Sequence, residues 1–307
     1  MARVLITGAT GTIGRALVAA LQVRGDEVVA LSRDADRARE ALGASVEVHP
    51  WPEPEQAPPP QSALAGAGAI VNLLGEPVAQ RWTDAAKRKI RDSRVLATRS
   101  LVAGLHALPE TNRPKTLVSQ SATGFYGPRD ERPVDEQAAA GSDFLAEVVV
   151  AWEREALATE PPTRVVLTRT GVVLSRGSGA LAQMLPPFRL GVGGPIAGGR
   201  QYVPWVHIDD VIGALLHCLD QPGLRGPANV TAPQAVTNAE LARALGRALG
   251  RPAVLPIPGF ALRLLYGQMA EIITTGQRAI PERLLASGYR FRQPELAAAL
   301  RDVLERR

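Results

Sequence analysis

Three evenly spaced glycines near the start of the chain mark the first candidate site. Gly8, Gly11 and Gly14 follow the apolar run 4–6 and precede residues 15–21, whose apolar side chains share one helical face. A strand that turns on glycines into a helix points backbone N–H groups and the positive helix end at one place, which suits a phosphate. The first glycine comes one residue earlier than in the G-x-G-x-x-G dinucleotide pattern. The turn predicts a pyrophosphate site made of Thr7, Gly8, Thr10, Gly11, Thr12, Ile13 and Gly14; the alternative is a tight turn without a ligand.

The residues that end the second predicted strand indicate which dinucleotide fits this turn. Ser32 and Arg33 stand about twenty residues beyond the glycines, where a ribose contact is expected. An acid there would accept the ribose hydroxyls of NAD, whereas a guanidinium and a hydroxyl suit the 2′-phosphate of NADP. We therefore predict NADP(H) as the preferred cofactor, with Arg37 adding charge. Asp34 keeps NAD(H) open, and a solvated helix start capped by Asp34 is the alternative.

Polar residues at the carboxyl ends of two further predicted strands extend this site. The fourth strand, 69–74, ends in Asn72, Leu73 and Leu74, followed by Gly75. The fifth, 115–120, brings Ser119 and then Ser121 to its end. In an open α/β sheet the carboxyl ends of the strands face the ligand crevice. We expect residues 72–75 and Ser119 to bind the cofactor.

The elements that must position these residues alternate along the first half of the chain. Apolar strand-like runs at 4–6, 27–31, 45–49, 69–74, 115–120 and 164–168 are separated by helical stretches. This alternation predicts an α/β fold with a doubly wound parallel sheet. Beyond Gly171 glycine and proline become frequent, which indicates a smaller C-terminal α+β domain over the crevice. We predict one domain over 1–170, with 208–232 contributing to it, and a second, mainly substrate-binding domain over 171–307.

Composition excludes several function classes. The 307 residues are 46% hydrophobic and 21% charged, as in an ordinary soluble globular protein. The net charge of +5 is not gathered into a basic block, so no nucleic-acid partner is expected. No segment predicts a membrane span or a signal peptide, which indicates a cytoplasmic location. Cys218 is the single cysteine and fits a core position. The oligomeric state stays open, with a homodimer compatible.

The histidines give no metal prediction. His49, His106, His207 and His217 lack ligand spacing, so we predict no metal site. His207 precedes Asp209 and Asp210 at a predicted helix start, where Asp209 is expected to be the N-cap.

Several longer motifs resemble a known family. These are Thr7-Gly-Ala-Thr-Gly-Thr-Ile-Gly14, Ser119-Gln-Ser-Ala-Thr-Gly-Phe-Tyr-Gly127, Trp205-Val-His-Ile-Asp-Asp-Val211, Leu190-Gly-Val-Gly-Gly-Pro195 and the tail 276–285. Over essentially its whole length the chain resembles the atypical extended short-chain dehydrogenase/reductases, in the nucleotide-sugar epimerase-like branch. The resemblance implies an NAD(P)-binding Rossmann domain, a C-terminal substrate domain, a catalytic serine at Ser121, and a position for Arg94 beside the cofactor pyrophosphate. The alternative for Arg94 is an exposed salt bridge.

The resemblance also implies a Tyr-x-x-x-Lys pair that this chain lacks. In the family the tyrosine exchanges a proton with the substrate, while the lysine lowers its pKa and holds the nicotinamide ribose. Here the corresponding helix reads Asp143-Phe-Leu-Ala-Glu-Val-Val-Val-Ala-Trp-Glu153, and no lysine follows Lys115. Ser121 and Tyr126 are the remaining catalytic candidates, Tyr126 if its ring turns toward the crevice. Loop packing is the alternative for Tyr126.

Two functions follow from these residues. The first is an NADP(H)-binding oxidoreductase or epimerase that acts on a nucleotide sugar or a small carbonyl or hydroxyl compound. The second is a protein that binds NADP(H) without turnover and acts as a redox sensor or regulator. The missing Tyr-x-x-x-Lys pair favours the second, and Ser121 with a full substrate domain favours the first.

Overall fold

A seven-stranded parallel sheet forms the centre of the protein. The computed structural model describes residues 2–177 and 179–305. The strands of the sheet lie in the order β11 (Gly226–Val230), β7 (Arg164–Thr170), β5 (Thr116–Ala122), β4 (Ala69–Asn72), β1 (Arg3–Thr7), β2 (Glu27–Ser32) and β3 (Glu47–Pro50). Each neighbouring pair is parallel. The predicted doubly wound parallel sheet is confirmed.

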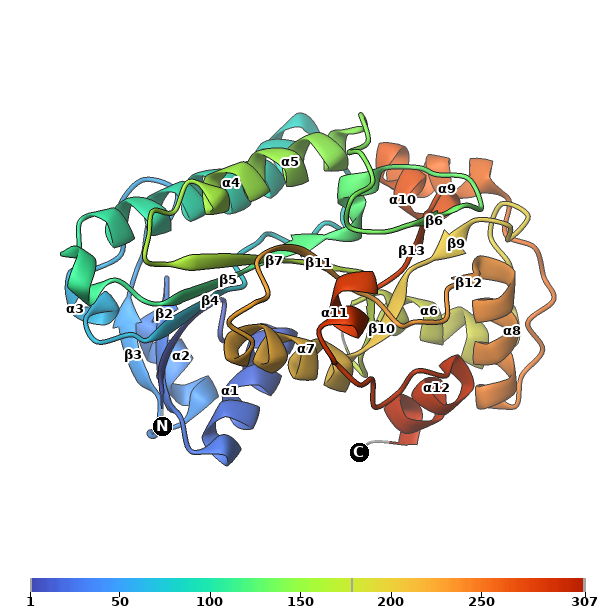
Figure 1. Ribbon diagram of the computed structural model, residues 1–307. Helices are drawn as coiled ribbons and strands as arrows, with labels where there is room; N and C mark the ends of the chain where they lie inside the picture. The colour runs from blue at the N-terminus through green and yellow to red at the C-terminus, as the bar shows by residue number, and fades with distance from the viewer. Residues whose placement is uncertain (1, 178, 306–307) are drawn as a thin grey trace.

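Helices cover both faces of this sheet (Figure 1). One face packs against α1 (Thr12–Arg24), α2 (Ala35–Leu42) and α7 (Ile208–Asp220), and the other against α3 (Gln61–Leu64), α4 (Asp84–His106) and α5 (Phe144–Leu157). In β1, Val4 and Ile6 enter the first core and Leu5 enters the second. Side chains alternate across a strand, so a strand covered on both faces must be apolar throughout. This is why the strands read as unbroken apolar runs.

The strand order reverses between β1 and β4, which places the crevice. From β1 the chain moves outward to β2 and β3, and then returns to β4 on the other side of β1. At the carboxyl edge the register sets Thr7 beside Asn72 and Asn72 beside Ser119. Ligands of open α/β sheets bind at such a reversal. Residues from three distant parts of the sequence therefore meet at one level.

The remaining elements build a second layer of structure beside the sheet. Short strand pairs join β8 (Val172–Leu174) to β10 (Trp205–His207), β9 (Tyr202–Val203) to β12 (Val236–Thr237), and β6 (Pro133–Val134) to β13 (Arg278–Ala279). A separate apolar core lies among α6 (Gly179–Arg189), α8 (Asn238–Leu249) and α12 (Leu296–Glu305). The helices α9 (Gly259–Tyr266) and α10 (Glu271–Thr274) complete this part, whereas α11 (Glu282–Ala286) packs on β11 of the central sheet.

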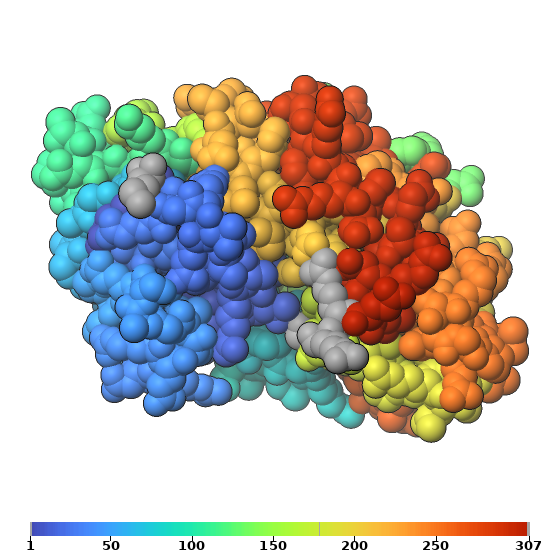
Figure 2. Space-filling view, turned by 90° about the horizontal axis from the view of Figure 1, so that it is seen from below, coloured from blue at the N-terminus to red at the C-terminus, as the bar shows by residue number. Residues whose placement is uncertain are grey.

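The segment 208–232 returns to the central sheet. It contains α7, which packs against α1, and β11, the edge strand beside β7. Seen from below, residues of α7 in gold lie between the blue N-terminal and the red C-terminal residues (Figure 2). The division into domains at residue 170 stays a prediction.

Among the described helices, α4 is the longest, with 23 residues. Over residues 2–177 and 179–305, no helix combines the length and the hydropathy required to cross a membrane.

Cys218 offers a simple test of the packing of α7. Its side chain is fully buried in the core between α1 and the sheet, and burial raises the pKa of its thiol to about 12. The thiolate is the reactive form, so the native thiol should be inert. We expect no alkylation of the folded protein by iodoacetamide at pH 8, measured by mass spectrometry, and complete alkylation in urea. Rapid labelling of the native protein would contradict this packing.

Candidate functional site

The glycine turn between β1 and α1 is exposed at the crevice. Gly8 has φ +68°, and a Cβ there would lie 2.8 Å from the Leu73 carbonyl oxygen. A Cβ on Gly14 would lie 2.3 Å from the carbonyl oxygen of Gly8. Both positions therefore require glycine. Gly11 is the N-cap of α1 and has no side chain to bond the first N–H groups of the helix.

The outer side of this turn leaves room for a phosphate. Gly11 and Thr12 are exposed, and Thr10 and Ile13 are partly exposed. A Cβ on Gly11 would approach only the carbonyl oxygen of Gly8, at 3.3 Å, so the space beyond it is open. An open helix N-terminus with no side-chain cap is an anion-binding arrangement. The turn thus fits the pyrophosphate of a dinucleotide.

Under the turn, a layer of hydrogen bonds connects three strands to α4. Asn72 is fully buried; its Oδ1 accepts from Thr7 Oγ1 at 2.7 Å, and its Nδ2 donates to Thr98 Oγ1 at 3.0 Å and Ser119 Oγ at 3.3 Å. Thr7 and Ser119 are also fully buried. These side chains lie beneath the surface and support the segment above them, in which Leu73 and Leu74 are partly exposed and Gly75 is exposed.

At the end of β2, Ser32 and Asp34 are hydrogen-bonded at the start of α2, whereas Arg33 is exposed. Ser32 donates from Oγ to the Asp34 carbonyl oxygen at 2.8 Å, and the Asp34 carboxylate accepts from the Arg37 N–H at 3.0 Å as the N-cap of α2. This is the helix-capping role that the sequence offered as the alternative for Asp34. Arg33 is exposed at the mouth of the crevice. Its contact with the 2′-phosphate stays a prediction.

Arg94 lies on the other side of the reversal, beside the end of β4. Its Nη1 donates to the Ile90 carbonyl oxygen of its own helix at 3.0 Å, and its Cζ lies 5.4 Å from the ring centroid of Trp152 on α5. A Cβ on Gly75 would lie 2.9 Å from the Cζ of Arg94, so glycine lets the guanidinium touch the backbone. Burial lowers the pKa of Arg94 to about 10, and the charge of Glu76 acts in the opposite direction. Arg94 therefore stays protonated at neutral pH.

Ser121 is bound to a buried ion pair. Its hydroxyl donates to Glu153 Oε1 at 2.6 Å, and Arg169 binds both oxygens of Glu153 at 2.8 Å. All three side chains are buried. Burial alone would lower the pKa of Arg169, but Glu153 raises it, so the guanidinium stays charged. The proton of the Ser121 hydroxyl is thus directed to a carboxylate.

Tyr126 lies behind this ion pair and not in the crevice. It is fully buried in η2 (Thr123–Tyr126), donates to Asn229 Oδ1 at 2.7 Å, and accepts from Arg169 Nη1 at 3.1 Å. Burial raises the pKa of its phenol, although Arg169 lowers it in part. The expected inward turn of the ring toward the crevice is not found, because Asn229 and Arg169 hold the hydroxyl in the core. This arrangement favours packing over the catalytic role, which stays a prediction.

The start of α5 carries apolar side chains where the family would have its Tyr-x-x-x-Lys pair. Phe144 packs edge-on against Trp82 with ring centroids 5.1 Å apart, and Lys87 Nζ lies 5.1 Å from the Phe144 ring centroid. Val148 and Val149 are buried. Lys87 comes from α4 and also donates to Gln268 at 2.5 Å. Proton donors of the family type are absent from this helix face.

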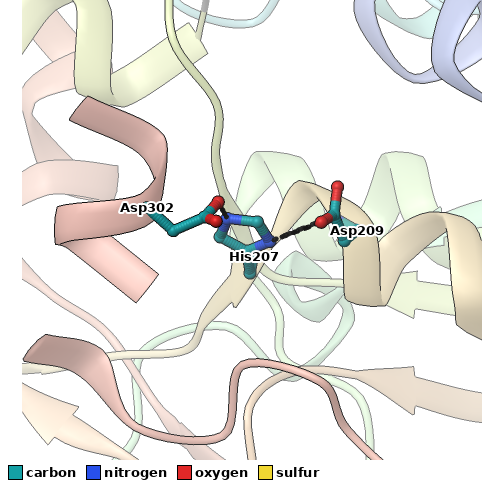
Figure 3. A group of neighbouring side chains, drawn as sticks. All are labelled: His207, Asp209 and Asp302. Carbon is teal, nitrogen blue, oxygen red and sulfur yellow. Dashed lines mark hydrogen bonds and ion pairs between the residues drawn. The ribbon is translucent and has the colours of Figure 1, made fainter. Parts of the chain in front are cut away.

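His207, Asp209 and Asp302 gather at the start of α7 (Figure 3). His207 Nδ1 accepts from the Asp209 N–H at 3.1 Å, so His207, and not Asp209 as predicted, is the N-cap of α7. His207 Nε2 lies 3.0 Å from Asp302 Oδ2 on α12. The carboxylates of Asp209 and Asp302 lie on opposite sides of the ring, and one ligand atom from each of the three residues lies within 4.8 Å of the others. The group connects α12 to β10, and we derive no metal site from it.

Sequence reasoning missed the partners of Ser121. Glu153 shares a helical face with Val149 and Ala156, and an acid on such a face is a signal of a buried partner. Arg169 stands in a buried strand, where a charge gives the same signal. Neither signal names the partner, because Glu153 and Arg169 come together only through the packing of α5 on the sheet.

Comparison with known proteins agrees with this geometry. The sequence profile described as "NAD dependent epimerase/dehydratase family" matches residues 4–230. The chain belongs to this family. A second profile, "Domain of unknown function (DUF1731)", matches residues 257–303. The resemblance seen in the sequence is therefore confirmed, and the two matches cover both the sheet and the C-terminal part.

Relatives of this family match the chain from end to end. The human epimerase family protein SDR39U1 is 39% identical over 98% of this chain and 99% of its own. A chloroplastic homologue from Arabidopsis thaliana is 36% identical over 98% of this chain and 86% of its own. The crystal structure of the human protein with NADPH superposes with a TM-score of 0.87 at 38% identity, covering 99% of both chains. A bound NADPH in that relative agrees with the cofactor predicted from Ser32 and Arg33.

The Tyr126 hydroxyl provides a test of the buried network. We expect Tyr126→Phe to destabilise the protein by about 1–3 kcal/mol, because Asn229 Oδ1 loses its donor in the core. Urea unfolding followed by circular dichroism measures this, and NADPH affinity should not change. Tyr266→Phe is the matched control, since Tyr266 is partly exposed and no hydrogen bond of its hydroxyl is found among the described residues. Equal stability of the two variants would contradict the structural role.

Proposed function

We propose that this protein binds NADP(H) in the crevice, with the pyrophosphate on the glycine turn and the 2′-phosphate on Arg33. The observation that carries the proposal is the exposed start of α1, where the N-cap Gly11 has no side chain to cap the helix. The human relative solved with NADPH supports it. NAD(H) is the weaker ligand, because the Asp34 carboxylate that could accept ribose hydroxyls caps α2 instead.

We further propose hydride-transfer chemistry, as an oxidoreductase or epimerase, on a nucleotide sugar or a small carbonyl or hydroxyl compound. Bound NADPH would donate the hydride to a carbonyl, and bound NADP⁺ would accept one from a hydroxyl-bearing carbon. Among the groups of this chain, Ser121 is the one we assign to the proton, because its hydroxyl is already hydrogen-bonded to the Glu153 carboxylate. Thr7, Asn72 and Ser119 lie beneath residues 73–75, which line the crevice.

A second candidate function is an NADP(H)-binding sensor or regulator without turnover. The enclosed phenol of Tyr126 and the apolar side chains of Phe144 and Val148 favour it, because they leave the crevice without the proton donor and lysine of the family. Cytoplasmic location and a homodimer remain proposals for this chain. Size-exclusion chromatography with light scattering measures the oligomeric state.

Cofactor selectivity tests the first part of this proposal. We expect NADPH to bind more tightly than NADH, measured by isothermal titration calorimetry. Arg33→Ala should remove most of that preference, about 1.5–3 kcal/mol for a charge-assisted contact. Arg39→Ala is the control, because Arg39 lies on α2 in an ion pair with Asp36. Gly11→Val should abolish binding of both cofactors while far-UV circular dichroism stays unchanged. Equal affinity of the unmodified protein for NADPH and NADH would refute the role of Arg33.

Turnover separates the two candidate functions. A positioned general acid–base contributes 10²–10⁴-fold, so its absence should hold rates far below the median of about 10 per second. We expect slow NADPH oxidation with simple carbonyls and slow NADP⁺ reduction or epimerisation with nucleotide sugars, both lowered further by Ser121→Ala. Brisk turnover that Ser121→Ala leaves intact would place the chemistry elsewhere. Tight NADPH binding with no turnover over a broad panel would favour the sensor.

A further inference from the structure

We infer that Arg94 makes the crevice discriminate between the two redox states of the cofactor, favouring NADPH over NADP⁺ through its charge near the nicotinamide. The inference rests on the proposed binding of NADP(H). It goes beyond that proposal, since it assigns to Arg94 a contact with the nicotinamide half and not with the pyrophosphate.

The position of Arg94 in the fold supports this assignment. Arg33, at the end of β2, marks the adenosine half of the crevice, so the other half of a dinucleotide crosses the reversal toward β4 and β5. Arg94 lies on that far side. It touches Gly75 after β4, and it lies against Trp152 of α5, which packs on β5. The pyrophosphate turn at Gly11 belongs to β1, between these two places.

The Arg94 guanidinium lies against Trp152 and forms no ion pair among the described residues. Trp152, the ring beside it, donates from Nε1 to Thr98 Oγ1 at 2.9 Å, and Thr98 in turn accepts from Asn72. Arg94 itself makes one hydrogen bond, to the Ile90 carbonyl oxygen. Within residues 2–177 and 179–305, no carboxylate forms an ion pair with it, and Glu76 acts only through its more distant charge. A partly buried, unneutralised cation exerts a strong field in the crevice.

This charge acts differently on the two cofactor states. NADP⁺ carries a positive nicotinamide ring and NADPH a neutral one, whereas their phosphates are the same. A guanidinium near the ring therefore repels NADP⁺ relative to NADPH. In the family the lysine of the Tyr-x-x-x-Lys pair would supply the positive charge from α5. In this chain α5 is apolar at its start, and Arg94 supplies a charge from α4.

The ratio of two dissociation constants isolates this effect. We expect the unmodified protein to bind NADPH more tightly than NADP⁺, measured by calorimetry at pH 7.5. Arg94→Gln should reduce the ratio of the NADP⁺ to the NADPH dissociation constant on the order of tenfold, as for unit charges several ångströms apart at a protein surface. Arg94→Lys, which keeps the charge, should retain most of the ratio. Circular dichroism checks that each variant is folded.

Arg33→Ala is the matched control, because both states carry the 2′-phosphate. It should weaken NADPH and NADP⁺ alike and leave their ratio unchanged. If Arg94→Gln also weakens both equally, Arg94 binds the pyrophosphate and the inference is wrong. Should Arg94→Gln fail to fold, an unchanged ratio in Gly75→Ala, whose methyl group must displace the guanidinium, would overturn the inference just as well. Failure of the unmodified protein to bind either state would instead refute the proposed function.

Discussion

The buried amide of Asn72 is the interaction on which the crevice depends. It binds Thr7 of β1, Thr98 of α4 and Ser119 of β5 at the level where the strand order reverses. Parallel strands leave polar backbone and side-chain groups at their carboxyl ends, and a buried polar group without a partner costs about 1–3 kcal/mol. The shared amide satisfies these groups together. It also fixes the height of the backbone at 73–75, against which Gly8 and Arg94 pack.

A second buried assembly connects the sheet to the C-terminal part. Arg169 of β7 binds Glu153 of α5, and its guanidinium lies 3.4 Å from the ring centroid of Phe125. Tyr126 extends the assembly to Asn229 of β11, which also donates to the Ile280 carbonyl oxygen at 2.8 Å. Removing one partner of a buried ion pair leaves an uncompensated charge and costs about 3–5 kcal/mol. The Glu153–Arg169 pair thus binds Ser121 directly and reaches Ile280 through Tyr126 and Asn229.

Together these assemblies determine which charged and polar groups lie near the crevice. Its reactive edge contains a serine bound to a carboxylate, apolar residues at the start of α5, and a single guanidinium from α4. Such a crevice suits a dinucleotide held by backbone amides and arginine. It is poorly equipped for fast proton transfer, because the one phenol nearby is in the core. Binding and redox discrimination are therefore better supported by this geometry than rapid turnover.

The sequence by itself determined the sheet, the glycine turn and the cofactor. Apolar runs of strand length, evenly spaced glycines between a strand and a helix, and Arg33 in place of an acid are local features, and local features can be interpreted without knowing what packs on them. Tertiary structure decided the roles of the polar residues. Tyr126, near Ser121 in sequence, lies in the core because Asn229, about a hundred residues later, accepts a hydrogen bond from its hydroxyl. Glu153 pairs with Arg169 for the same reason, because packing brings together partners that are distant in the chain. His207 caps its own helix locally, but only the packing of α12 places Asp302 beside its ring.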